Sequence, residues 1–450
     1  PIVIERGRDA EARAQKVEHF RSGGELDPEC NVQFGEGGAG TFSDGKLNTG
    51  IKDKRIIWML EQFVEHGAPE HILYDAKPHI GTDVLINVVQ SIRKTVIANG
   101  GEVRFSNKLT GLILDRNRLT GIEVSSPDGA YTLECDSVIL AIGHSARDTF
   151  EMLDKSGVPM QPKAFSMGAR IEHKQADIDL AQYGAAHDGL PAADYSLNVH
   201  FDDGESAYTF CPGGEVIAAA SEEGGVVTNG MSRSRRDGEN ANAALLVTLT
   251  PDDFPYDGVL GGMYWQREIE KKAYEIGHDY KACAQTVGDF LARTPSTNAG
   301  SVTPSYKPGV HWGDIRSVLP EKITWSGRYP SSVKSSRASM RPMRCSPHPR
   351  QDLPHRCAFC VMLTGARKFG GCTPAAKGQA MPEASCPPQR TVCAAQKKSG
   401  RYIHDEKACS GGGLPERQPP CSYREDGRGR RLHCGLFHRG PSAPGPGGGV

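Results

Sequence analysis

The sequence lacks long hydrophobic runs, an excess of either charge and a recognisable leader. No stretch reaches about 18 consecutive apolar residues, the length that crosses a bilayer, so no transmembrane helix is expected. The formal net charge of −1 argues against a general binder of nucleic acids or membrane surfaces. The chain begins directly within the apolar run Ile2-Val3-Ile4, so no signal peptide is predicted. These absences favour a cytoplasmic protein whose partner is neither a nucleic acid nor a membrane.

Cysteine is scarce in the first 328 residues and crowded after them. Four of the 13 cysteines lie in that first part, and the rest follow between residues 345 and 434. Sparse cysteine is typical of a reduced cytosolic protein. At 450 residues the chain is longer than one hydrophobic core supports, so more than one domain is expected.

Glycine is concentrated in residues 35–46, here called the glycine loop, which read Gly-Glu-Gly-Gly-Ala-Gly-Thr-Phe-Ser-Asp-Gly-Lys. This density excludes a stable helix or strand interior, because glycine loses much backbone entropy there. Bare N–H groups in a tight loop, followed by Thr41 and Ser43, suit an anionic oxygen such as that of a pyrophosphate. Composition alone also allows an ordinary mobile surface loop.

Hydrophobic periodicity divides the first 157 residues into helices and strands. Residues 1–5 predict a short buried strand that ends in Glu5, where a dinucleotide-binding fold carries an acid for the ribose hydroxyls. The preceding strand and G-x-G-x-x-G turn of such a fold are absent. Helical spacing indicates helices at 53–66, 82–97 and 146–155. Alternation predicts strands at 102–105, 108–115, 118–125 and 130–135, and the apolar run 136–144 predicts a fully buried strand.

Four segments occur in the order typical of a bacterial family of FAD-dependent proteins, often called NAD(FAD)-utilising dehydrogenases. They are residues 5–7 (Glu-Arg-Gly), 33–47 with the glycine loop, 77–83 (Lys-Pro-His-Ile-Gly-Thr-Asp) and 141–148 (Ala-Ile-Gly-His-Ser-Ala-Arg-Asp). The chain resembles this family over roughly residues 1–328. The resemblance implies an α/β fold: a Rossmann-like FAD-binding domain with a parallel sheet, similar to that of glutathione reductase, interrupted by a mixed β-rich substrate domain.

The resemblance also implies noncovalent FAD and the residues that would bind it. Glu5 would hold the adenosine ribose, and Leu109 would meet the adenine. Ala141, Gly143 and His144 would close over the flavin nucleotide. The pyrophosphate and the ribityl–isoalloxazine side would be lined by Gly37, Gly38, Gly40, Thr41 and Ser43, and further predicted contacts are Arg6, Gly35 and Lys46. The family's name implies NAD(P)H as electron donor, although no second G-x-G-x-x-G is present.

The predicted catalytic residues are His79, Arg170 and Cys211, with His144, Glu222 and Glu223 as further candidates near the flavin. His79 follows a proline, so it could instead order its loop. Cys211 could be a redox-active thiol, which requires an electropositive, partly open site. A disulfide-reductase mechanism is disfavoured, because Thr209 stands where this family often has another cysteine and no C-x-x-C lies near the glycine loop.

The predicted domains are an FAD-binding domain at 1–157, an inserted substrate domain at 158–295, a return to the FAD domain at 296–328 and an aberrant tail at 329–450. The tail is rich in Pro, Gly, Arg, Ser and Cys and has no apolar period, so it cannot bury a core. A frameshifted translation is the favoured interpretation. A disordered tail and a zinc-binding segment around the Cys357-x-x-Cys360 pair are the alternatives.

The leading functional hypothesis, which the resemblance implies, is an FAD-dependent oxidoreductase. It would transfer hydride or electrons to or from an unknown small-molecule substrate or electron acceptor. The first alternative is a catalytically inactive nucleotide-binding remnant, since both ends of the expected FAD site are missing from the sequence. The second is a zinc-binding interaction protein that acts through the cysteine-rich tail. No metal site is predicted outside that tail, and the oligomeric state is left open.

Overall fold

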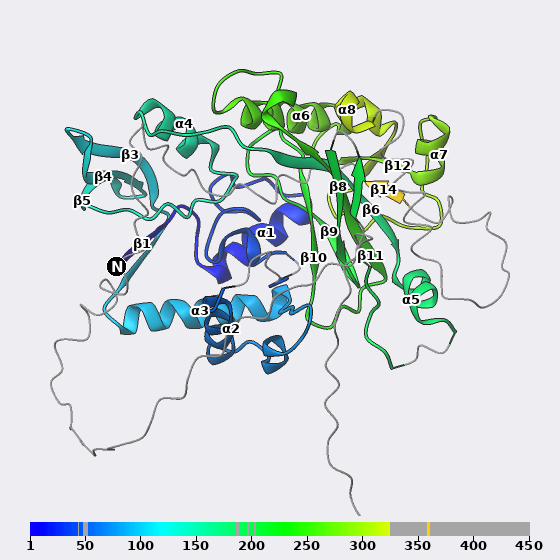
Figure 1. Cartoon of the computed structure of the whole chain (residues 1–450), viewed down its shortest axis with the longest axis horizontal. Coiled ribbons are helices and arrows are strands. Elements are labelled where there is room, and N and C mark those ends of the chain that lie inside the picture. Colours follow the sequence, from blue (N-terminus) through cyan, green and yellow to red (C-terminus); the bar gives the residue numbers. More distant parts are fainter. Residues whose placement is uncertain are drawn as a thin grey trace, which may run out of the picture. The chain divides into compact units, whose positions relative to one another are not determined.

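The computed structural model describes residues 1–43, 45–47, 53–185, 189–195, 198–201, 204–324 and 358–360. All of them fall within one unit, residues 1–378. The unit is a mixed α/β structure with both parallel and antiparallel strand pairs (Figure 1). The predicted tail at 329–450 lies outside the described residues, except for the short strand β14 (Ala358–Cys360).

The N-terminal part contains the parallel pair that the α/β prediction requires. Strand β1 (Ile2–Glu5) pairs in parallel with β2 (Glu102–Phe105), with Glu5 opposite Phe105. The connection between them carries the helices α1 (Ala10–Arg21), α2 (Arg55–Glu65) and α3 (Thr82–Ala98). Helix α1 begins at a typical N-cap, because the Asp9 carboxylate accepts hydrogen bonds from two first-turn N–H groups.

A three-stranded antiparallel meander follows, as the alternating pattern predicts. Its strands are β3 (Lys108–Asp115), β4 (Arg118–Ser126) and β5 (Gly129–Glu134). The two-residue turn between β3 and β4 places Arg116 and Asn117 at positive φ, which matches the right-handed twist of a hairpin.

One predicted element is wrong: residues 136–144 do not form a strand. Ile139 is 94% exposed, and β1 is also more open than predicted, with Ile2 46% and Val3 44% exposed. A buried parallel strand needs neighbours along its edges and cover on both faces. Within the described part of the chain the β1–β2 sheet has two strands only, so this apolar run has no sheet to enter.

The second part is built on a seven-stranded mixed sheet with the order β13-β12-β14-β6-β11-β8-β7. Its centre is the antiparallel pair of β6 (Phe165–Lys174) and β11 (Asn240–Leu249), joined along their whole length. The outer strands are β7 (Asn198–Phe201), β8 (Gly204–Cys211), β12 (Ala282–Thr286) and β13 (Val310–Trp312). A separate hairpin consists of β9 (Gly214–Ala218) and β10 (Thr228–Ser232). The helices are α4 (Arg147–Lys155), α5 (Gln175–Tyr183), α6 (Gly261–Gly277), α7 (Val287–Ala292) and α8 (Glu321–Thr324).

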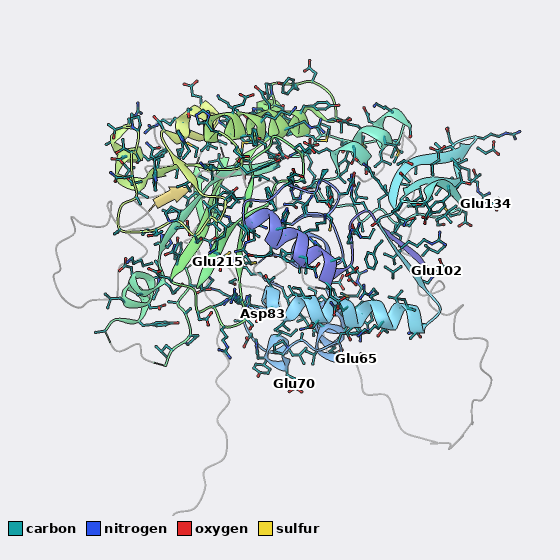
Figure 2. All side chains as sticks on the ribbon, turned by 180° about the vertical axis from the view of Figure 1, so that it is seen from behind. Glu65, Glu70, Asp83, Glu102, Glu134 and Glu215 are labelled. Carbon is teal, nitrogen blue, oxygen red and sulfur yellow. The ribbon has the colours of Figure 1, made fainter. Side chains whose placement is uncertain are left out.

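Helix α1 joins the two parts. Its apolar residues Val17 and Phe20 share one buried cluster with residues 216–220, in and after strand β9. At its end, Arg21 pairs with Glu215 of β9 at 2.6 Å. Asp83, in the first turn of α3, accepts bonds from the N–H and hydroxyl of Ser234. Figure 2 shows Glu215 and Asp83 where the N-terminal helices meet the strands of the second part. These contacts hold helices α1 and α3 against strand β9 and the residues that follow β10.

His173 on β6 makes the folded state sensitive to acid. It is 3% exposed, and burial lowers its pKa from 6.5 to about 4. Between these values the unfolded chain binds a proton that the native chain does not, so stability falls as the pH falls through this window. From the size of the pKa shift, we expect His173 alone to lower the free energy of unfolding by on the order of 3 kcal/mol across this window. Urea unfolding of wild type and His173→Gln at both ends of the window measures it, and equal losses in the two proteins would contradict the expectation.

Candidate functional site

Glu5, at the carboxyl end of β1, is tied to the start of the glycine loop. Its Oε1 accepts the N–H groups of Gly7 at 2.8 Å and Gly35 at 2.9 Å. Gly7 and Gly35 approach so closely that a Cβ on Gly7 would lie 2.6 Å from the Gly35 Cα. With Oε1 occupied twice, Oε2 is the oxygen that could accept a ligand hydroxyl.

The glycine loop adopts a backbone that only glycine reaches easily. Gly35, Gly37, Gly38 and Gly45 have positive φ. A Cβ on Gly38 would meet no atom within 4 Å, and the same holds at Gly40. The loop therefore offers open space against bare backbone, which fits the close approach of an anionic group such as a pyrophosphate.

The two hydroxyl groups of the loop bond to the loop itself. Thr41 is buried and donates to the Glu36 carbonyl at 3.2 Å, and Ser43 donates to the Gly40 carbonyl at 3.0 Å. The side chains of Thr41 and Ser43 thus shape the loop. A direct contact between either hydroxyl and a cofactor stays a prediction.

Arg6 belongs to a cluster of four charges beside the loop. Its guanidinium pairs with Glu29 at 2.6 Å and Asp148 at 2.8 Å, and Lys108 pairs with the same two carboxylates. Although burial raises the pKa of Asp148, the bonds from Arg6 and Lys108 outweigh it and hold that pKa well below its usual range. The Arg6 guanidinium also stacks 4.2 Å from the ring centroid of Phe34. Arg6 is therefore held rigidly next to Glu5.

A cavity of about 440 Å³ opens next to this cluster. Arg6, Phe34 and Asp148 line one side of it, and Glu222 and Arg267 line the other. Its size is within the range of small-molecule pockets. Further lining residues are Pro28, Glu29, Ser145, Arg147, Ser221, Glu223 and Lys271.

Arg147, at the first position of α4, ties the two walls of the cavity together. It is 3% exposed and pairs with Glu222 and with Glu270, each at 2.6 Å. Arg267 pairs with Glu222 at 2.8 Å and with Glu151 at 2.9 Å. Glu222, a candidate near the flavin, therefore serves as a bridge between two arginines, whereas Glu223 lies exposed at the rim.

The residue predicted to meet the adenine and those predicted to close over the flavin nucleotide lie on separate segments. Leu109 sits in β3 opposite Val124. Ala141 and Gly143 are exposed in the non-strand segment before α4, and Gly143 has positive φ. His144 is half-buried near Arg147, and burial together with the charge of Arg147 lowers its pKa to about 4. His144 is therefore neutral near pH 7, which suits a binding role better than proton transfer.

The other end of the glycine loop brings together three predicted residues. Lys46 forms a β-bridge with His79 and places its ammonium 3.6 Å from the Cys211 sulfur. His79 is buried, with its Nε2 at 3.1 Å from the Ser232 hydroxyl of β10. Residues far apart in the sequence thus form one compact cationic and nucleophilic group, here called the Lys46 cluster (Lys46, His79, Cys211 and Ser232).

Arg170 lies on the same face of the large sheet, next to this cluster. It donates to Asn242 at 2.6 Å and to Asn229 at 3.0 Å. Asn242 pairs with Cys211 across the β11–β8 ladder. A Cβ on Gly230 of β10 would lie 2.3 Å from the Arg170 guanidinium, so β10 covers Arg170 tightly. Arg170 is therefore buried next to the Lys46 cluster, with an exposure of 3%.

The sequence reasoning missed two buried arginines, Arg13 and Arg147. Arg13 follows the apolar residue Ala10 by three positions on α1, so its place on the apolar side of that helix was a usable signal. Arg147 gave no comparable signal, because its partners Glu222 and Glu270 are distant in sequence.

The comparisons with known proteins point to one cofactor. Residues 164–330 match the family model described as "FAD-dependent protein, C-terminal domain-like". An uncharacterised protein of Clostridium beijerinckii is 46% identical over 329 residues, which cover 72% of this chain and 61% of that protein. The chain thus spans less than two thirds of that relative.

Two solved structures show weak likenesses. One is aklavinone-11 hydroxylase in complex with FAD and aklavinone, with a TM-score of 0.27 and 12% identity over 56% of this chain and 46% of that one. The other is CabE, an aromatic hydroxylase from angucycline biosynthesis, with a TM-score of 0.25 and 10% identity over 57% and 44%. At these TM-scores they say nothing about the reaction of this chain. Residues 164–330 of this chain are thus similar to the C-terminal domain of a family of FAD-dependent proteins.

Proposed function

We propose that this chain is an oxidoreductase that binds FAD noncovalently along the glycine loop. The course of that loop carries the proposal. It starts at Gly35, held by the Glu5 carboxylate, and ends at Lys46, which contacts Cys211 and pairs with His79. A cofactor that follows the loop would have its adenosine end at Glu5 and its flavin end at the Lys46 cluster.

The loop and its surroundings have the chemistry for these two ends. Glu5 Oε2 would accept a ribose hydroxyl, and the exposed Gly37 and Gly40 would let the pyrophosphate approach the backbone. The β1–β2 pair would belong to a Rossmann-like sheet, as the resemblance implies. Arg6, Leu109 and the segment 141–144 would flank the adenosine end.

The Lys46 cluster would act on the substrate at the flavin end. FAD, when bound, supplies the hydride or electron transfer. The Lys46 ammonium would place a positive charge next to the Cys211 sulfur, at 3.6 Å. The His79 imidazole, next to the Ser232 hydroxyl, can hold or pass a proton at Nε2. Arg170, buried next to these residues, would contribute a fixed positive charge to the site.

The electron donor, the compartment and the partners are further parts of the proposal. NAD(P)H is the proposed donor, and a small molecule is the proposed acceptor. None of the helices in the described residues is long and apolar enough to cross a bilayer. The described cysteines Cys30, Cys135, Cys211 and Cys283 are free thiols, which supports the proposed reduced, cytoplasmic compartment.

Replacing Cys211 with serine or His79 with glutamine tests the assigned roles. We expect each change to slow anaerobic reduction of the bound flavin by NADH or NADPH by more than about tenfold, the usual scale for losing one acid–base group. Stopped-flow absorbance near the flavin band measures the rate. Cys135→Ser, a thiol outside the cluster, is the matched control. Flavin that is bound but never reduced in the wild type would instead support the inactive remnant.

A further inference from the structure

Arg13 on α1 is a fully buried arginine that the chemistry proposed above does not use. Its exposure is 0%, and its guanidinium donates to four main-chain carbonyls, those of Asn31 (2.9 Å), Val32 (3.0 Å), Gly35 (3.2 Å) and Glu36 (2.6 Å). One side chain thus holds the whole backbone turn that leads into the glycine loop.

The bond to the Glu36 carbonyl sets the direction of the next N–H. In a planar trans peptide the C=O and N–H bonds point in opposite directions. Because the Glu36 oxygen is held toward Arg13, the N–H of Gly37 points away from the guanidinium, at a residue that is exposed. The Thr41 hydroxyl donates to the same oxygen and reinforces this orientation.

The charge of Arg13 is not cancelled by a directly bonded carboxylate. In the described part of the chain its hydrogen-bond acceptors are the four carbonyls alone. The Glu36 carboxylate instead pairs with Arg93 at 3.2 Å and accepts a hydrogen bond from the Ala10 N–H at 2.8 Å. Burial lowers the pKa of Arg13 to about 10, which leaves it protonated near neutral pH. The Phe42 ring, 4.7 Å from the guanidinium carbon, covers this charge.

We propose that Arg13 is a positioning residue for the anionic part of the cofactor, an inference that rests on the proposed FAD site. It aims the Gly37 N–H at an anionic oxygen and places a buried positive charge behind that N–H. The oxygen belongs either to the pyrophosphate or to the flavin ring, which gains negative charge on two-electron reduction. A buried charge acts strongly here because little water screens it.

Three variants of the full chain test the proposal: Arg13→Met, Arg13→Lys and, as a matched control, Arg21→Met on the same helix. Arg21 pairs with Glu215 and Glu18, and it bonds to none of the described residues of the glycine loop. Quenching of flavin fluorescence gives the dissociation constant for FAD, and urea unfolding without FAD reports the fold. We expect about 100-fold weaker binding for Arg13→Met and about tenfold for Arg13→Lys, the scale of lost charged hydrogen bonds. The control should bind like the wild type.

The flavin midpoint potential distinguishes a pyrophosphate oxygen from a flavin-ring oxygen as the group that Arg13 acts on. A more negative potential in Arg13→Met, restored in Arg13→Lys, assigns the charge to the flavin ring. An unchanged potential with weaker binding assigns it to the pyrophosphate. If Arg13→Met does not fold, Arg13→Lys carries the test through its dissociation constant. If folded Arg13→Lys, and Arg13→Met where it folds, bind FAD as tightly as the wild type, the proposed role of Arg13 is wrong but the FAD site stands. If the wild type itself binds no FAD, the proposed FAD site is wrong as well.

Discussion

Replacing Gly37 with valine is expected to weaken FAD binding by at least about 100-fold, equivalent to about 3 kcal/mol of binding energy. Gly37 has a φ of 79°, and a Cβ there would lie 2.1 Å from the Thr41 hydroxyl oxygen and 3.0 Å from Val89. A branched residue cannot adopt this backbone without strain, so the loop must change shape. Fluorescence titration of FAD measures the loss.

Gly67→Ala is the matched control for this substitution. Gly67 also has positive φ, but a Cβ there would meet no atom within 4 Å, and it follows α2 away from the loop. Its variant carries similar backbone strain without a clash and should bind FAD like the wild type. Unchanged FAD affinity in a folded Gly37→Val protein would show that the cofactor does not depend on this loop.

Replacing Arg147 with methionine is expected to lower the free energy of unfolding by about 3–5 kcal/mol, the usual cost of removing one partner of a buried ion pair. The reason is that Glu270, which is buried, would lose its cation, and Glu222 would lose one of two. Urea unfolding of the cofactor-free protein measures the change.

Arg267→Met is the control, because Arg267 shares Glu222 with Arg147 but lies in a partly exposed position. We expect it to cost about 1 kcal/mol, as for exposed ion pairs. Adding Glu270→Leu to Arg147→Met should recover part of the loss, since the buried carboxylate is then removed as well. A small loss of unfolding free energy in Arg147→Met, with no recovery in the double variant, would mean that the Arg147–Glu270 pair does not join α4 to α6.

Regular elements with strong local patterns could be predicted from the sequence. Strands β2 and β3 begin and end where the alternating pattern places them, and helix α3 ends one residue later than its helical spacing predicts. The structure also brings together Lys46, His79 and Cys211, three residues that were predicted separately for the site, although their roles stay predictions. Local periodicity carries this information because each such element buries one face.

Contacts between distant segments could not be predicted in this way. The run 136–144 has the composition of a buried strand, yet composition cannot say whether neighbouring strands are present to receive it. Arg147 looks like an ordinary surface arginine in the sequence, and the sequence does not show which groups Arg13 binds. Arg13 is buried because it bonds to four carbonyls of a turn. Arg147 is buried because it pairs with acids more than 70 residues away in the sequence.

The absorption spectrum of the purified chain, loaded with FAD and then desalted, tests the FAD site most directly. We predict that the protein retains flavin, with bands near about 370 and about 450 nm as expected of an oxidised flavin cofactor. The Gly37→Val variant should lose these bands, and Gly67→Ala should keep them. A colourless wild-type protein after desalting would contradict the account, because the glycine loop would then bind no FAD.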